Sequence, residues 1–177
     1  VDAAGRILGA HALGSTFKVV VTRGPMTDLT PIAMMAAIPQ LSPRDTLRAS
    51  IAGASFTITY SRPTKRGRVV FGGMVPWGEV WRTGANEATH FHTDKDLVIG
   101  GADVPAGSYT LWTTPTPEEW TLIINKQTGQ WGTIYDSTQD LVRVGMHHEP
   151  LPATEEQFTV SLEPMEAGAV LRLKWDD

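Results

Sequence analysis

Three histidine positions on an otherwise β-rich chain have the spacing of metal ligands. His90 and His92 flank Phe91, and the pair His147–His148 follows in a later segment. In an extended strand alternate side chains share a face, so His90 and His92 point the same way while Phe91 faces the core. A His-x-His pair and one imidazole from a second strand could supply three ligands to a zinc-like ion and leave a fourth position for water.

The identity of the third ligand depends on the local geometry of residues 142–148. Strict alternation places His147 on the same face as Arg143 and so favours His147. Gly145 could instead mark a β-bulge that turns His148 toward the metal. The alternative interpretation is that all of these histidines lie on solvated strand faces and bind nothing.

Three charged residues could assist a metal-bound water. Glu87 precedes His90 closely and is a candidate general base, or a partner that orients an imidazole. Arg82 and Arg62 could stabilise developing negative charge. The structural alternatives are an Arg82–Glu87 ion pair and an Arg62 side chain that binds loop carbonyl groups.

The segments that position these residues are short and alternate between apolar and polar side chains. Gly100-Gly101 separates two such segments, and this pair predicts a tight hairpin because glycine accepts positive φ freely. The pattern predicts an all-β chain, an antiparallel β-sandwich with a two-sheet jelly-roll or immunoglobulin-like architecture. We expect strands near residues 56–61, 97–99, 102–104, 108–113, 120–124, 141–144, 157–162 and 169–175.

The chain divides into an N-terminal extension, residues 1–41, and a β-sandwich domain, residues 42–177. We expect strands and one short helix in the extension. The apolar segment 31–38 favours a helix because Thr30 suits the N-cap, Pro31 the first helical position and Pro39 the end. The same segment could be the remnant of a signal-peptide core. It is shorter than the ~20 apolar residues that span a bilayer, so no transmembrane segment is predicted.

Composition excludes several functional classes. The chain has no cysteine, which excludes disulfides, thiolate metal sites and a cysteine nucleophile. The formal net charge of −4 argues against a nucleic-acid partner. Six tryptophans are more naturally core residues, although an exposed row of them would suggest sugar stacking.

Several motifs together resemble one bacterial protein family. These are Tyr60-Ser-Arg-Pro63, Gly67-Arg68, the long segment 71–89 (FGGMVPWGEVWRTGANEAT), the segment 105–112 (PAGSYTLW), the segment 119–125 (EWTLIIN) and Gln130-Trp-Gly132. The chain resembles a family of small, mostly exported β proteins catalogued only as a domain of unknown function. The resemblance implies a β-sandwich and a periplasmic or secreted location, and it implies no established activity. Members of that family more often carry threonine where this chain has His90 and His92, so a histidine site would belong to this protein or a subgroup.

The leading prediction is a metal-dependent hydrolase that acts on a small-molecule ester or phosphoester. One divalent ion, zinc by preference, would be held by His90, His92 and either His147 or His148, and would activate a water molecule. The alternative is a non-catalytic β-sandwich that binds a glycan or a cell-envelope partner, and a metal buffer is a third interpretation. A homodimer is a candidate assembly.

Overall fold

The structure is a computed structural model that describes residues 9–11, 20–22, 41–166 and 168–176. The chain divides into two units, Val1–Pro39 and Gln40–Asp177. In the first unit, β1 (Gly9–His11) pairs antiparallel with β2 (Val20–Thr22). The helix predicted at residues 31–38 lies outside the described residues.

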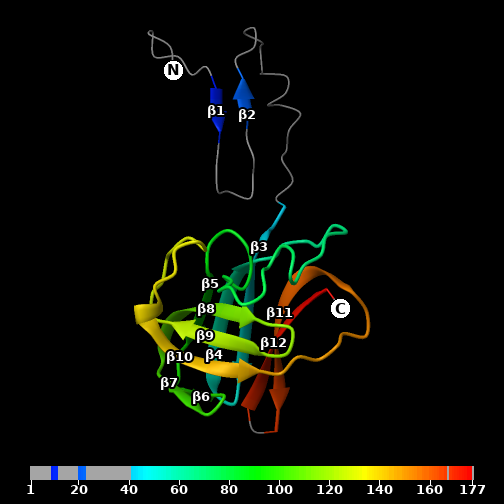
Figure 1. Ribbon diagram of the computed structural model, residues 1–177. Helices are drawn as coiled ribbons and strands as arrows, with labels where there is room; N and C mark the ends of the chain where they lie inside the picture. Colours follow the sequence, from blue (N-terminus) through cyan, green and yellow to red (C-terminus); the bar gives the residue numbers. More distant parts are fainter. Residues whose placement is uncertain (1–8, 12–19, 23–40, 167, 177) are drawn as a thin grey trace, which may run out of the picture. The chain divides into compact units, whose positions relative to one another are not determined.

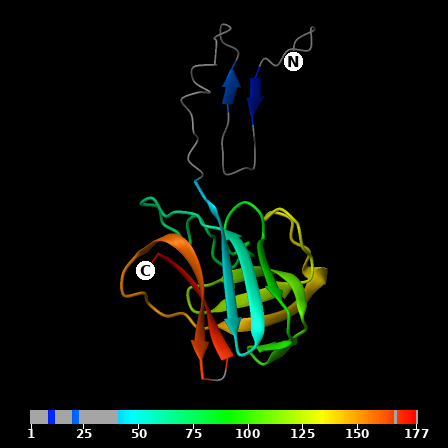
Figure 2. The same ribbon diagram turned by 180° about the vertical axis from the view of Figure 1, so that it is seen from behind.

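The second unit is built on a twisted antiparallel sheet, here called the main sheet (Figures 1 and 2). Its strand order is β10-β9-β8-β5-β4-β3, so β10 and β3 form its two edges. The strands are β3 (Arg44–Ile51), β4 (Ala54–Ser61), β5 (Thr89–Thr93), β8 (Gly107–Pro115), β9 (Trp120–Asn125) and β10 (Asp140–Met146).

Two hairpins accompany the main sheet. β6 (Leu97–Ile99) and β7 (Ala102–Val104) form a small hairpin whose turn uses Gly100 and Gly101, both with positive φ (57° and 84°). β11 (Glu155–Met165) and β12 (Gly168–Asp176) form a long hairpin that packs over one face of the main sheet. We call this second one the C-terminal hairpin, and its strand β11 contacts β3.

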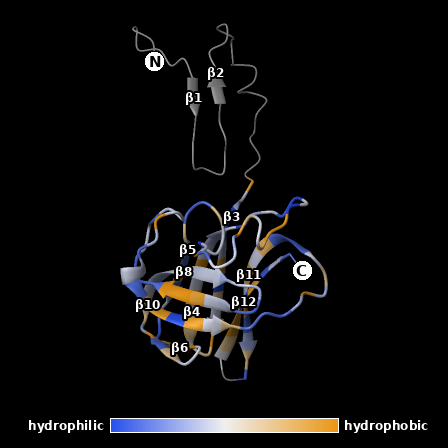
Figure 3. Ribbon diagram, viewed as in Figure 1, coloured by the Kyte–Doolittle hydropathy of each residue, from blue (hydrophilic) through white to orange (hydrophobic). Residues whose placement is uncertain are grey.

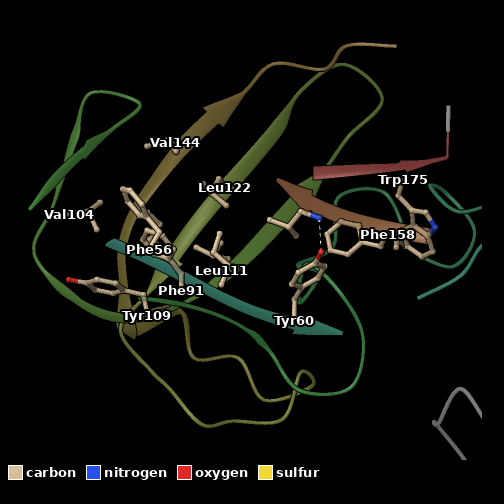
Figure 4. Close-up of a cluster of buried hydrophobic side chains, with 14 of the residues drawn as sticks. Phe56, Tyr60, Phe91, Val104, Tyr109, Leu111, Leu122, Val144, Phe158 and Trp175 are labelled. Atoms are coloured by element: carbon tan, nitrogen blue, oxygen red, sulfur yellow. Dashed lines mark hydrogen bonds between the residues drawn. The ribbon is translucent and has the colours of Figure 1, made fainter. Parts of the chain in front are cut away.

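The inner face of the main sheet is the face that packs against the C-terminal hairpin. Its strands contribute one apolar side chain at every second position, as alternation requires. The resulting core joins the main sheet to Phe158, Val160 and Trp175 of the hairpin (Figure 4). The buried main-sheet members are Ala54, Phe56, Ile58, Tyr60, Phe91, Tyr109, Leu111, Leu122, Ile124 and Val144. The apolar colour in Figure 3 accordingly follows these strands, while the connecting loops are largely polar.

The outer face of the main sheet is mostly polar. Threonines and serines occupy many of its positions on β4 and β8. Among the described residues, apolar burial on this face is limited to a small separate cluster of Ala88, Trp112 and Ile123, with Tyr135 packed against it. Loop residues cover this cluster. Asn125, which is buried on this face, donates hydrogen bonds to Asp136 and Asp140 and accepts one from the Gln127 N–H.

The predicted fold class is confirmed: the described residues form antiparallel sheets in an all-β, sandwich-like arrangement, with one short 3-10 turn, Ser137–Gln139, as their only helical element. The predicted strands and the Gly100-Gly101 hairpin are present as well. Within the described part of the chain, no helix has the length and apolarity needed to cross a membrane.

Candidate functional site

The first histidine pair lies on the outer face of β5. His90 is half-buried, and its Nδ1–H donates to the Ala88 carbonyl at 2.9 Å while its Nε2 accepts from the Gly129 N–H at 2.9 Å. Burial, the largest cause, lowers the pKa of His90, and a neutral ring with Nδ1 protonated satisfies both bonds. Because both ring nitrogens bind backbone groups, His90 links β5 to the 126–132 loop.

His92 is exposed on the same face. Its Nδ1 lies 3.0 Å from the Ser108 hydroxyl on the neighbouring strand β8. The prediction that His90 and His92 share a face and that Phe91 enters the core is confirmed, since Phe91 is 4% exposed in the core cluster.

The second histidine pair lies beyond the end of β10, which stops at Met146. His147 and His148 are both exposed and belong to the segment that leaves the main sheet toward β11. Pairing of β10 with β9 is regular through Gly145 and Met146, so the bulge considered at Gly145 is not formed.

The structure does not bring the two histidine pairs together. β8 and β9 lie between β5 and β10 in the main sheet, so the two strands are about 14 Å apart at a spacing of ~4.8 Å per strand. Ligands of one zinc ion lie only ~2 Å from it. His90 and His92 also occupy the outer face, whereas His147 and His148 border a groove that opens on the inner side. Within residues 41–166 and 168–176, no group of three or more histidine and acidic side chains is placed to hold a metal ion.

The residues expected to assist the metal have other partners. Glu87 forms an ion pair with Arg44 at 2.6 Å, with both side chains about 40% exposed. Arg82 does not pair with Glu87 as the structural alternative proposed, and instead donates to the Gly132 carbonyl at 3.3 Å. Burial lowers the pKa of Arg82. Its side chain packs so closely on Gly132 that a Cβ there would collide with it.

Arg62 connects β4 to the C-terminal hairpin. Its Nε donates to the Phe158 carbonyl at 3.0 Å, one terminal nitrogen donates to Thr159, and the other pairs with Asp45 at 3.3 Å. Nearby, the buried Tyr60 hydroxyl accepts a bond from the Val160 N–H (Figure 4). Burial raises the pKa of Tyr60. Arg62 therefore has a structural role, as the alternative to anion binding predicts.

A groove of about 730 Å³ lies between β10 and the C-terminal hairpin. We call it the inter-sheet groove. Its walls are mainly apolar, and many of the side chains that form them are only half-buried. These half-buried groups are Phe71, Ile99, Trp120, Met146, Leu151, Val170, Leu171 and Leu173.

Charged groups lie along one side of the inter-sheet groove. Arg172 and Lys174 of β12 bind the Glu163 carboxylate at 2.8 and 2.9 Å, and Arg172 also binds Glu149 at 2.6 Å. Hydrogen bonds from Lys174 and Arg172 lower the pKa of Glu163 to about 2. Glu149 and Glu163 are thus both neutralised by cations. The apolar wall is therefore the dominant chemical feature of the groove. His147 and His148 are exposed and also line the groove.

The sequence motifs did not indicate the inter-sheet groove. Alternation of Leu171, Leu173 and Trp175 with Arg172 and Lys174 does predict an apolar face on β12. It gives no sign that the hairpin leaves part of that face uncovered, which depends on how far the hairpin extends across the main sheet.

A family model described as "Protein of unknown function (DUF2911)" matches residues 42–177, which include the whole main sheet and the C-terminal hairpin. The chain belongs to this family. This membership confirms the family resemblance inferred from the sequence motifs. The description of the family names no activity. No curated protein and no solved structure matches the chain.

Proposed function

We propose that this protein is a non-catalytic binding module that holds an apolar chain, such as the acyl chain of a lipid, in the inter-sheet groove. One observation carries the proposal: the half-buried apolar side chains of β10, β12 and the 147–152 segment gather around a single groove. Contiguous exposed apolar surface of this kind is costly in water and commonly marks a binding site.

The size of the inter-sheet groove suits a small ligand. Its volume of about 730 Å³ falls within the ~300–1,000 Å³ typical of ligand sites. Each methylene group buried against the apolar walls contributes about 0.8 kcal/mol before the costs of association. The polar end of such a ligand would lie beside His147, His148 and Glu149, which are exposed residues that line the groove.

The hydrolase and zinc predictions depend on a convergence of histidines that the strand order opposes, and no observation favours them over binding. They can be tested together with the proposal. Metal content and hydrolysis of model esters and phosphoesters are measured before and after chelation. Stoichiometric metal that is lost in His92→Ala, with hydrolysis that chelation abolishes, would contradict a non-catalytic module.

Binding itself is tested with a fluorescent fatty acid such as dansyl-undecanoic acid, displaced by unlabelled palmitate. Leu151→Asp places a charge in the groove wall and should weaken binding about tenfold, because the carboxylate must be desolvated. Val98→Asp is the matched control: Val98 is 71% exposed on β6 and does not line the groove. Failure of palmitate to displace the probe, or equal weakening in both variants, would overturn the proposal.

A further inference from the structure

The outer face of the main sheet carries a straight polar row that crosses four strands. Arg48 of β3 lies opposite Thr57 of β4, Thr57 lies opposite His92 of β5, and His92 lies opposite Ser108 of β8. All four side chains occupy the face away from the core, because their strand neighbours Leu47, Ile58, Phe91 and Tyr109 pack inward. We call these four residues the polar row.

The polar row is accessible and cationic. Arg48, His92 and Ser108 are exposed, and Thr57 is half-buried. Among the residues that the structure describes, no carboxylate forms an ion pair with Arg48, while Glu87 on the same face is already held by Arg44. The Ser108 hydroxyl can donate to His92 Nδ1 at 3.0 Å, which leaves the opposite ring nitrogen, Nε2, to donate outward.

A second row of hydroxyl groups lies beside the first. Thr46 of β3 lies opposite Thr59 of β4, and Thr59 lies opposite His90 of β5. Beyond His90, the segment that contains Trp131 pairs with Glu87 through a β-bridge. The same loop reaches the outer face, because the Gly129 N–H donates to His90 Nε2, and the Trp131 side chain, two residues further on, is 49% exposed.

These groups match the chemistry of an acidic polysaccharide better than that of other anions. Sugar rings stack on exposed aromatic side chains, ring hydroxyls bind threonine and serine hydroxyls, and carboxylates bind guanidinium groups. Arg48 and His92 lie two strands apart, about 10 Å, a span that two linked sugar rings cover. An open face also suits an extended polymer.

We propose that the outer face binds a polysaccharide whose sugar rings carry carboxylates. Arg48 and His92 donate to the carboxylates, Thr57 and Ser108 bind hydroxyls, and Trp131 stacks on a ring. The site lies on the opposite face from the inter-sheet groove, so the two proposals stand or fall separately.

The test measures binding of polygalacturonate by calorimetry at about 0.15 M salt, where long-range attraction is screened. The fully methyl-esterified polymer, which keeps the hydroxyls and lacks the charge, serves as the neutral comparison. Arg48→Gln should weaken polygalacturonate binding at least about fivefold, because it removes a charge-assisted hydrogen bond. Arg66→Gln is the matched control, since Arg66 is exposed in the loop after β4.

A second variant, Trp131→Ala, should weaken binding of both polymers, because stacking does not need the carboxylate. Thermal unfolding confirms that each variant is folded. Absence of polygalacturonate binding, equal binding of the methyl ester, or equal loss in Arg48→Gln and Arg66→Gln would overturn the proposal. If polygalacturonate binds but the fatty acid does not, only the proposal for the inter-sheet groove is refuted.

Discussion

The two faces of the main sheet are made by the same strands and have different physical roles. On the inner face, apolar side chains from β4 to β10 join the C-terminal hairpin in one continuous core. On the outer face, several polar side chains, such as His90 and His92, bind the backbone or one another, and apolar burial among the described residues is limited to a small cluster around Trp112. The inner face therefore stabilises the fold, while the exposed part of the outer face is accessible to a ligand.

The position of the histidines follows the same division. His90 and His92 belong to the outer face, where His90 also links β5 to the loop at Gly129, whereas His147 and His148 line the inter-sheet groove. The four histidines that the sequence suggested as one metal site thus belong to two surfaces with different chemistry.

The largest expected effect separates the two faces within a single strand. Ile58 is fully buried on the inner face of β4, and Thr57 next to it is half-buried on the outer face. Ile58→Ala should lower the free energy of unfolding by about 3 kcal/mol through lost burial and a cavity. Thr57→Ala should change it by less than about 0.5 kcal/mol. Urea unfolding measures both, and similar losses would show that the faces do not differ as described.

A smaller effect is expected where the outer face is buried by polar contacts. Asn125 holds the loop after β9 through three hydrogen bonds, to Asp136, Asp140 and Gln127. Asn125→Ala should lower the free energy of unfolding by about 2 kcal/mol, because buried polar groups lose their partners. Hydrogen exchange at the Gln127 amide should also accelerate. Unchanged exchange at that amide would contradict the role assigned to Asn125.

The smallest effect concerns the protonation of His90. Because burial lowers its pKa below the usual 6.5, the folded state resists a proton that the unfolded state accepts. The free energy of unfolding should therefore decrease as the pH falls below about 6.5, and His90→Gln should reduce that pH dependence. Titration by NMR measures the pKa directly. A His90 pKa at or above 6.5 would contradict the neutral, doubly bonded ring.

Much of the fold was predictable because side-chain alternation is a local property. Phe91 between His90 and His92 correctly assigned the two faces of β5, and Gly100-Gly101 correctly placed a hairpin. The candidate metal site was not predictable in the same way, because it required two distant strands to be neighbours. The contacts of Arg62 could not be predicted for the same reason. Its partners Phe158 and Thr159 lie almost a hundred residues away in the sequence, and no local pattern predicts them.

The sequence by itself determined which segments become strands and which side chains each strand presents to the core. These features can be predicted because each strand has its own two-residue alternation of apolar and polar side chains. Only the tertiary structure decided that β8 and β9 separate β5 from β10, that Arg48, Thr57, His92 and Ser108 form one row, and that the C-terminal hairpin leaves a groove. Strand order and register depend on the packing of the whole core, so they are set between segments and cannot be read within any one of them.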